Sequence, residues 1–181
     1  MKIGQDDSIK NFIMDIVLKW IIDITIVIVF ALFVTDYYCS AVDVVGNSMN
    51  PIVSNEEKVL IDKLSYEIKE PERFDIIAYK TRSGEISVKR IIGLPGETIQ
   101  IVDNRIYIDG EKIEDVYFEG KFESGYIDEA LVIGDNEYFV MGDNRNVSED
   151  SRFEYVGNID KVDVLGKAWF VCYPFNKLRG I

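Results

Sequence analysis

The first forty residues of the chain contain one long apolar run. No residue from Ile24 to Val34 carries a charge, and the apolar character extends from Trp20 to Cys39, with acidic residues near both ends. A helix needs about 20 apolar residues to cross a bilayer. We therefore predict a transmembrane anchor over residues 20–39, preceded by a separate segment of residues 1–19.

Two other interpretations of this run are open. A buried helix of a soluble protein would normally keep a polar face, and this run has little polar surface. A cleavable signal peptide would place small residues after the run, as Cys39-Ser40-Ala41 does. The run is long for a signal peptide, so we favour an anchor that is retained.

Lysines are distributed unevenly around the apolar run. Lys2, Lys10 and Lys19 precede it, and the next basic residue after it is Lys58. Basic residues next to membrane spans gather on the cytoplasmic side. The sequence therefore predicts a single-pass protein of the cell membrane, in contact with the lipid bilayer, with a cytoplasmic N-terminus and an extracytoplasmic domain over residues 40–181.

After Ala41 the pattern changes to short β-like runs separated by turn residues. Such runs predict a mainly β domain, an antiparallel coiled sheet or barrel. Asp103-Asn104 is a candidate two-residue hairpin turn, and the acidic residues 111–136 are predicted to form a short excursion from the sheet. The predicted strands are Ala41–Val45, Lys58–Leu64, Asp75–Lys80, Glu85–Ile92, Thr98–Val102, Arg105–Ile108, Glu137–Met141 and Val162–Cys172.

Composition excludes several classes of function. The chain has 181 residues, a formal net charge of −12 and no histidine. An acidic chain is a poor nucleic-acid binder, because phosphates require a basic face. Without histidine, Ser-His-Asp catalysis, Cys-His catalysis and histidine-ligated zinc are excluded. Cys39 and Cys172 are too few for a disulfide framework or a four-cysteine metal site, so no metal is expected; whether they pair with each other stays open.

A short segment after the first predicted strand places a serine on a tight turn. Gly46 and Asn47 tolerate unusual backbone angles, and Pro51 restricts Asn50. Such a turn suits an exposed nucleophile at Ser48. It equally suits an ordinary loop, because turns are rich in these residue types.

A nucleophilic serine in a chain without histidine needs a lysine, a carboxylate or a terminal amine as its base. In the predicted strand Glu85–Ile92, Ser87, Lys89 and Ile91 share one face among β-branched neighbours. Burial lowers the pKa of a lysine and makes a neutral amine available. Lys89 is therefore a candidate base for Ser48. The alternative is a lysine that extends from a strand edge into water.

A third segment, Gly142–Arg152, follows an apolar strand and combines hydroxyls, acids and two arginines. Ser148 is a candidate to orient the lysine amine. Asp150 is expected to form charge-assisted hydrogen bonds with Arg152 or Arg145 that hold the loop. Read alone, the segment is also typical of a solvated loop with local Asx turns.

Together these segments resemble the signature boxes of the bacterial type I signal peptidases, or leader peptidases, in the compact form common in Gram-positive bacteria. The boxes are Gly46–Pro51, Lys89–Glu97 and Gly142–Arg152, in the order of that family and after an N-terminal anchor. The resemblance covers most of residues 20–175. Each box is weak alone, but the three with the anchor form a specific pattern.

The resemblance implies a role for each matching residue. Ser48 would be the nucleophile, its backbone N–H an oxyanion donor, and Lys89 the general base. Gly46 departs from members that carry a serine there, so a second oxyanion donor is unassigned. The remaining matches are Ser148, Asp150 and Arg152 as supporting residues, and Val44, Met49 and Val88 as walls of small substrate pockets.

The implied protein is a membrane-anchored serine endopeptidase that needs no cofactor. It would cleave signal peptides from exported preproteins that carry small residues at positions −1 and −3. One rival is a self-cleaving transcriptional repressor, which would need a DNA-binding domain and no anchor. Another is an anchored β-scaffold without catalysis, which would have no use for Ser48 and Lys89 together.

Overall fold

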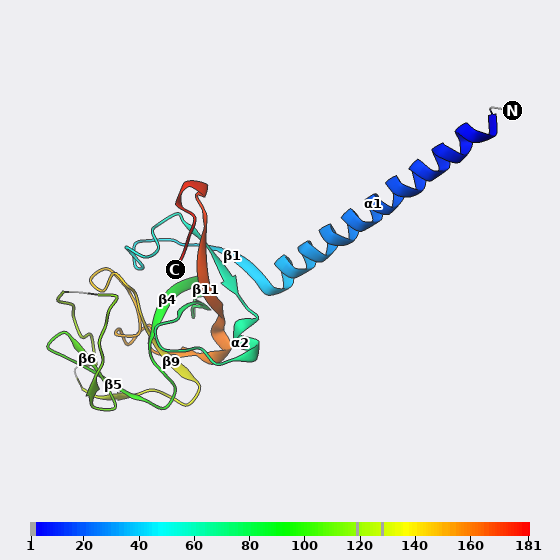
Figure 1. The fold of residues 1–181 in the computed structure, drawn as a ribbon. Coiled ribbons are helices and arrows are strands. Elements are labelled where there is room, and N and C mark those ends of the chain that lie inside the picture. The colour runs from blue at the N-terminus through cyan, green and yellow to red at the C-terminus, as the bar shows by residue number, and fades with distance from the viewer. Residues whose placement is uncertain (1–2, 119, 128) are drawn as a thin grey trace. The chain divides into compact units, whose positions relative to one another are not determined.

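The computed structural model describes residues 3–118, 120–127 and 129–181, in two units that meet at Tyr38 and Cys39 (Figure 1). Lys2, one of the lysines used to predict orientation, lies outside the described residues. For Lys10 and Asp36 only the helical backbone is described.

The first unit is the helix α1 (Ile3–Tyr38). Its apolar part, Phe12–Phe33, has 22 residues and none of them is buried. At 1.5 Å per residue this part is about 33 Å long, which matches the apolar thickness of a bilayer. The hydroxyls of Thr25 and Thr35 donate to backbone carbonyls four residues earlier, at 2.7 and 2.9 Å, so they need no water. The helix and its apolar part both begin before the predicted start at residue 20.

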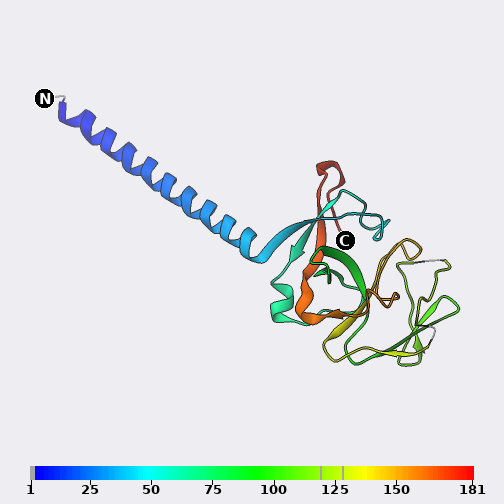
Figure 2. The same cartoon turned by 180° about the vertical axis from the view of Figure 1, so that it is seen from behind.

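The second unit contains a large antiparallel sheet in the order β1-β2-β11-β3-β4-β9-β10, with β12 paired to β11. Figures 1 and 2 show β11 crossing the middle of this unit, where it pairs with β2 and β3. Three register shifts along β11, in its pairing with β2 and β3, bend the sheet into a coiled shape. The bounds are β1 (Cys39–Asp43), β2 (Lys58–Asp62), β3 (Ile76–Lys80), β4 (Ile86–Gly93), β9 (Glu137–Met141), β10 (Ile159–Asp160), β11 (Val164–Tyr173) and β12 (Arg179–Gly180).

A smaller sheet, in the order β7-β6-β5-β8, follows β4. Asp103 and Asn104 have φ angles of 50° and 61°, as a two-residue hairpin turn requires, so the predicted turn is confirmed. The predicted excursion was placed too late, because this sheet already begins at Thr98. The bounds are β5 (Thr98–Val102), β6 (Arg105–Ile108), β7 (Glu111–Lys112) and β8 (Leu131–Val132); the short helices are α2 (Ser65–Ile68), η1 (Lys161–Asp163) and η2 (Phe175–Lys177).

Strand β4 is buried on both faces from Val88 onward. Val88 joins a core cluster with residues of β1, β2, β3 and β11. Ile91, on the opposite face, joins a second cluster with Ile77 and Val140. The residues of β4 on either face are therefore removed from water, which decides the chemistry of its two basic residues.

The predicted fold class is correct: one apolar N-terminal helix and a mainly antiparallel β unit. β5, β6 and β9 have the predicted bounds, and the other predicted strands are shifted at one or both ends by one or two residues. The strands that were not predicted are the two-residue β7, β8, β10 and β12, which are too short to show alternation. The thiols of Cys39 and Cys172 are free.

Candidate active site

The turn that carries Ser48 directly follows β1 and is held by its own side chains. Gly46 has a φ of 90°, a left-handed backbone that glycine adopts without strain. Its N–H donates to Oδ1 of Asn55 at 2.7 Å. Asn50 Nδ2 donates to Oδ1 of Asn47 at 3.2 Å. Among the described residues, none accepts or donates a hydrogen bond at the hydroxyl or the N–H of Ser48, so both groups are available to a substrate.

Lys89 lies in the middle of β4, opposite Ile77 of β3, with only 5% of its surface exposed. Within the described part of the chain its ammonium forms no hydrogen bond and no ion pair. Burial lowers the pKa of Lys89 to about 8, although the negative charge of Asp150 acts in the opposite direction. The prediction that Lys89 sits among apolar neighbours on the strand is confirmed.

Ser48 and Lys89 line the same open cleft, with a volume of about 860 Å³. Val45, Tyr79 and Ser87 also line it, so the cleft runs across β3 and β4 beside the Ser48 turn. A general base must come within hydrogen-bond reach of the proton that it removes, and both groups must be open to the same substrate. The shared cleft meets the second condition. The structure therefore brings together the two residues that the sequence singled out.

The loop from Gly142 to Arg152 packs directly against the Ser48 turn. A Cβ atom at Gly142 would lie 2.4 Å from the carbonyl oxygen of Ser48 and 2.3 Å from Oγ of Ser148. Only glycine fits at this contact. Ser48 and Ser148 are therefore neighbours across the backbone of Gly142, although they lie far apart in the sequence.

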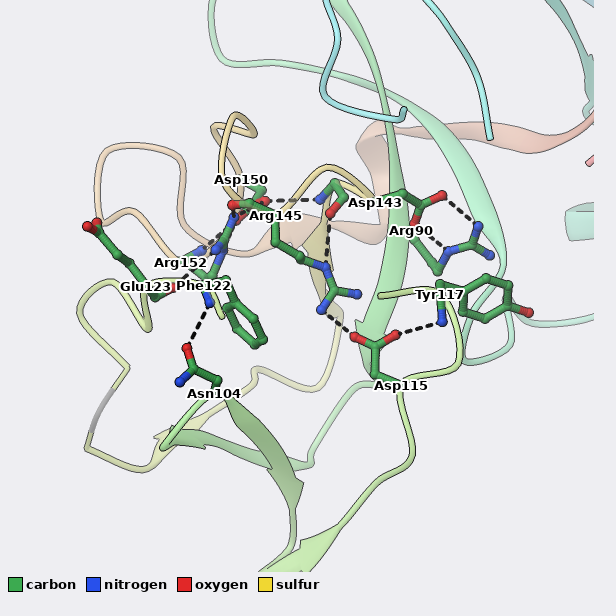
Figure 3. Close-up of polar contacts among 11 residues, drawn as sticks. Arg90, Asn104, Asp115, Tyr117, Phe122, Glu123, Asp143, Arg145, Asp150 and Arg152 are labelled. Carbon is green, nitrogen blue, oxygen red and sulfur yellow. Dashed lines mark hydrogen bonds and ion pairs between the residues drawn. The ribbon is translucent and has the colours of Figure 1, made fainter. Parts of the chain in front are cut away.

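Asp150 and Arg152 form the buried centre of this loop (Figure 3). Arg152 donates from Nε and Nη2 to the two oxygens of Asp150 at 2.8 and 2.9 Å. The backbone N–H of Gly142 donates to Oδ2 of Asp150 at 3.0 Å. Of the two partners expected for Asp150, Arg152 is the one observed, and Asp150 fixes the backbone beside Ser48.

Arg145, the other expected partner, pairs instead with Asp115 from the excursion (Figure 3). Its guanidinium lies 5.4 and 5.5 Å from the ring centres of Phe118 and Phe122, and its Nε donates to the carbonyl of Gly142 at 3.0 Å. The excursion thus supplies a partly buried counterion to the buried Arg145. The acidic composition of the excursion alone did not reveal this pairing.

A second buried ion pair was also missed. Arg90 donates from Nε and Nη2 to the two oxygens of Asp143, both at 2.7 Å, and its guanidinium lies 3.6 Å from the ring centre of Tyr117 (Figure 3). One signal for it was present in the sequence. Strand alternation places Arg90 on the same face as Val88 and Ile92, and a buried arginine requires an acidic partner.

Ser148 is buried, and its hydroxyl has no hydrogen-bond partner among the described residues. The hydrogen bond to Lys89 that the sequence suggested is therefore not formed in this structure. A buried hydroxyl without a partner is costly. The role of Ser148 toward the amine stays a prediction.

Val44, Met49 and Val88 are buried together in one core cluster. Their sequence neighbours Val45, Ser48 and Ser87, rather than these three side chains, line the large cleft. Their role as walls of substrate pockets stays a prediction.

Comparison with known proteins agrees with the motifs. The family model described as signal peptidase, peptidase S26, matches residues 17–173. Signal peptidase I S of Bacillus subtilis (strain 168) is 35% identical over 172 residues, which cover 90% of this chain and 92% of that protein. Signal peptidase IB of Staphylococcus aureus (strain COL) is 27% identical over 179 residues, 90% of this chain and 93% of that protein.

A solved structure, that of a signal peptidase I from Enterococcus faecalis V583, is 36% identical and covers 55% of this chain and 97% of that chain, with a TM-score of 0.47. The family model alone spans most of the sequence, including the Ser48 turn, β4 and the Gly142–Arg152 loop. The chain therefore belongs to the signal peptidase family, peptidase S26.

Proposed function

We propose that this chain removes signal peptides from preproteins as a membrane-anchored serine endopeptidase, with Ser48 as nucleophile and Lys89 as general base. One observation carries this assignment. Lys89 is a buried lysine with no ion-pair partner among the described residues and a pKa of about 8, and it lines the same cleft as Ser48. In a chain without histidine, such an amine is the natural base for a serine.

The acylation step follows from these groups. Neutral Lys89 accepts the proton of the Ser48 hydroxyl while Oγ attacks the scissile carbonyl, and a tetrahedral oxyanion forms. The ammonium of Lys89 then gives this proton to the leaving amine, the C–N bond breaks, and an acyl-enzyme remains. In the deacylation step Lys89 takes a proton from water while the water oxygen attacks the acyl carbon. The bond between this carbon and Ser48 Oγ then breaks, Lys89 returns the proton to Oγ, and the signal peptide leaves with a free carboxylate.

The oxyanion needs donors that already point toward it. The N–H of Ser48 has no partner among the described residues and is the proposed donor. The N–H of Gly46 is already used by Asn55 at 2.7 Å, and glycine has no side chain to help. We therefore assign the N–H of Ser48 as one oxyanion donor. The second oxyanion donor is unassigned.

Ser148, Asp150 and Arg152 support the base in this proposal. Asp150 and Arg152 hold the loop against the Ser48 turn, and the negative charge of Asp150 also acts on Lys89. The unpartnered hydroxyl of Ser148 would accept a hydrogen bond from the amine once the substrate is bound.

The substrate is proposed to bind as an extended chain along the segment that continues β1. β1 is the first strand in the sheet order, so one of its edges is unpaired and can accept a further strand. Small residues at positions −1 and −3 would face the surface formed over Val44, Met49 and Val88. No metal or organic cofactor takes part in these steps.

We propose that the helix α1 anchors the protein with its N-terminal end in the cytoplasm, because Lys2, Lys10 and Lys19 lie toward that end and the next basic residue is Lys58. The β unit would then act on the outer face of the membrane. Preproteins present their cleavage sites on that face.

The test uses the full-length protein in detergent micelles and a preprotein substrate. Ser48→Ala and Lys89→Ala should each lower turnover by at least about 10³-fold without unfolding the protein. Ser124→Ala and Lys112→Ala are the matched controls, because both residues lie on the small sheet and its excursion, and their side chains have no hydrogen-bond or ion-pair partner among the described residues. Normal turnover by either active-site variant would exclude the mechanism.

A further inference from the structure

The Ser48 turn is connected to the rest of the molecule by few hydrogen bonds. Within the described residues, Gly46 bonds to Asn55 and Met49 bonds to Val53, both in the same stretch of chain. Two residues far away in the sequence donate hydrogen bonds to this stretch. Arg179 donates from Nη2 to the carbonyl of Ile52 at 2.7 Å, and Asn144 donates to the carbonyls of Asn47 and Ser48, next to the nucleophile.

Asn144 holds two consecutive carbonyls of the turn. Its backbone N–H donates to the carbonyl of Ser48 at 2.9 Å, and its Nδ2 donates to the carbonyl of Asn47 at 3.0 Å. Two bonds from one residue to adjacent peptide groups fix both the position and the tilt of the backbone that carries the nucleophile.

The loop segment that carries Asn144 is itself held by hydrogen bonds. The carbonyl of Asn144 accepts from the N–H groups of Val147 and Ser148 at 3.1 and 3.0 Å. Gly142, two residues earlier, is fixed by Asp150 on its N–H and by Arg145 on its carbonyl, both at 3.0 Å. Asn144 therefore joins the Ser48 turn to the loop that carries Asp150 and Glu149, whose charges act on Lys89.

We propose that Asn144 is a positioning residue that sets the place of the Ser48 hydroxyl relative to the amine of Lys89. It does not touch the reacting atoms. It acts through the carbonyls of Asn47 and Ser48, which precede and follow the Cα atom of the nucleophile. A misplacement of about 1 Å between reacting groups can cost about 100-fold in rate, so this contact should affect kcat. The proposal rests on the proposed roles of Ser48 and Lys89.

The experiment measures kcat, KM and the pH dependence of kcat with the full-length protein in micelles and a peptide that spans a signal-peptide cleavage site. Asn144→Ala removes the side-chain bond and keeps the backbone bond. It should lower the high-pH plateau of kcat by about 10- to 100-fold and leave KM within about threefold. Its pH midpoint should remain at the wild-type value, because the surroundings of Lys89 are unchanged.

Asn144→Asp keeps the size of the side chain but turns an oxygen toward the carbonyl of Asn47. It should lower the plateau more than Asn144→Ala does. Asn146→Asp is the matched control, since it adds the same charge to the same loop at an exposed residue whose side chain has no hydrogen-bond partner among the described residues. It should keep the wild-type plateau.

Rates are expressed per folded molecule, with the folded fraction taken from thermal unfolding of each variant. A plateau equal to the wild-type value in both Asn144 variants overturns the proposal, as does a loss that follows only the folded fraction. A shift of the pH midpoint in Asn144→Ala also overturns it, because the residue would then act through Lys89. If Ser48→Ala or Lys89→Ala retains activity, the proposed function fails instead, so the two failures are distinguishable.

Discussion

Lys89 and Arg90 are neighbours on β4 and are almost equally buried, with 5% and 4% of their surfaces exposed. Alternation places them on opposite faces of the strand. Arg90 donates from Nε and Nη2 to the two oxygens of Asp143 and from Nη1 to the carbonyl of Phe74, and it stacks on the ring of Tyr117. Lys89 has no hydrogen-bond or ion-pair partner among the described residues. One buried cation is thus neutralised by a neighbour, and the other by a lowered pKa.

This difference separates a structural cation from a chemical one. An arginine cannot lose its proton under these conditions, so its burial requires an acid. A lysine can lose its proton, and its burial without a partner produces a neutral amine. The same strand therefore uses Arg90 to hold the loop at Asp143 and presents Lys89 to the cleft.

The largest effect on stability is expected when the carboxylate partner of Arg90 is removed. Asp143→Asn leaves a buried guanidinium without its counterion, which costs about 3–5 kcal/mol of unfolding free energy. Thermal unfolding of the full-length protein in micelles measures this loss. Asp135→Asn makes the same chemical change at an exposed residue and should stay within about 0.5 kcal/mol of wild type. A loss below about 1 kcal/mol in Asp143→Asn would contradict the view of Arg90 as a fixed charge.

The converse change removes the charge of Lys89. The folded-state pKa is about 8 and the ordinary value is 10.5. Between these values the unfolded chain binds more protons, so wild-type stability rises with pH from about 8 to 10.5 and is lowest below pH 8. Lys89→Met should therefore be more stable than wild type by about 3 kcal/mol near pH 7.

This advantage of Lys89→Met should shrink above pH 8 and be largely lost near pH 10.5. Unfolding midpoints of both proteins across that range measure it. Lys112→Met changes an exposed lysine and should show no such pH dependence. A constant difference between Lys89→Met and wild type at every pH would mean that packing, rather than the buried charge, separates them.

The environment of Lys89 could be predicted from the sequence, whereas that of Arg90 could not. Strand alternation and β-branched neighbours are local, so they describe the surroundings of Lys89 directly. The partner of Arg90 is Asp143, 53 positions away on the loop after β9. Nothing local pairs these two residues, because their contact depends on β4 and β9 lying side by side.

The loop after β9 shows the same limit. The sequence offered both Arg145 and Arg152 as partners of Asp150, and only the fold distinguishes them. Arg152 is close enough in the chain to turn back onto Asp150, while Arg145 is taken by Asp115. The hydrogen bonds of Asn144 were likewise hidden, since they depend on the loop packing against the Ser48 turn.

The smallest expected effect tests how a nearby charge acts on the pKa of Lys89, without a change in the packing around the lysine. Glu149 lies at an exposed position of the loop, and its charge raises the pKa of Lys89 against the effect of burial. Glu149→Gln should therefore move the pH midpoint of kcat to lower pH, by roughly a few tenths of a pH unit. The active amine is the neutral form, so the variant should be faster than wild type below the midpoint and equal to it on the plateau.

The shift should fade in about 1 M salt, where the screening length is near 3 Å. Glu154→Gln, at another exposed glutamate that does not act on Lys89, should leave the midpoint in place. A midpoint that rises in Glu149→Gln, or that moves equally in both variants, would show that the charge of Glu149 does not act on Lys89 as proposed.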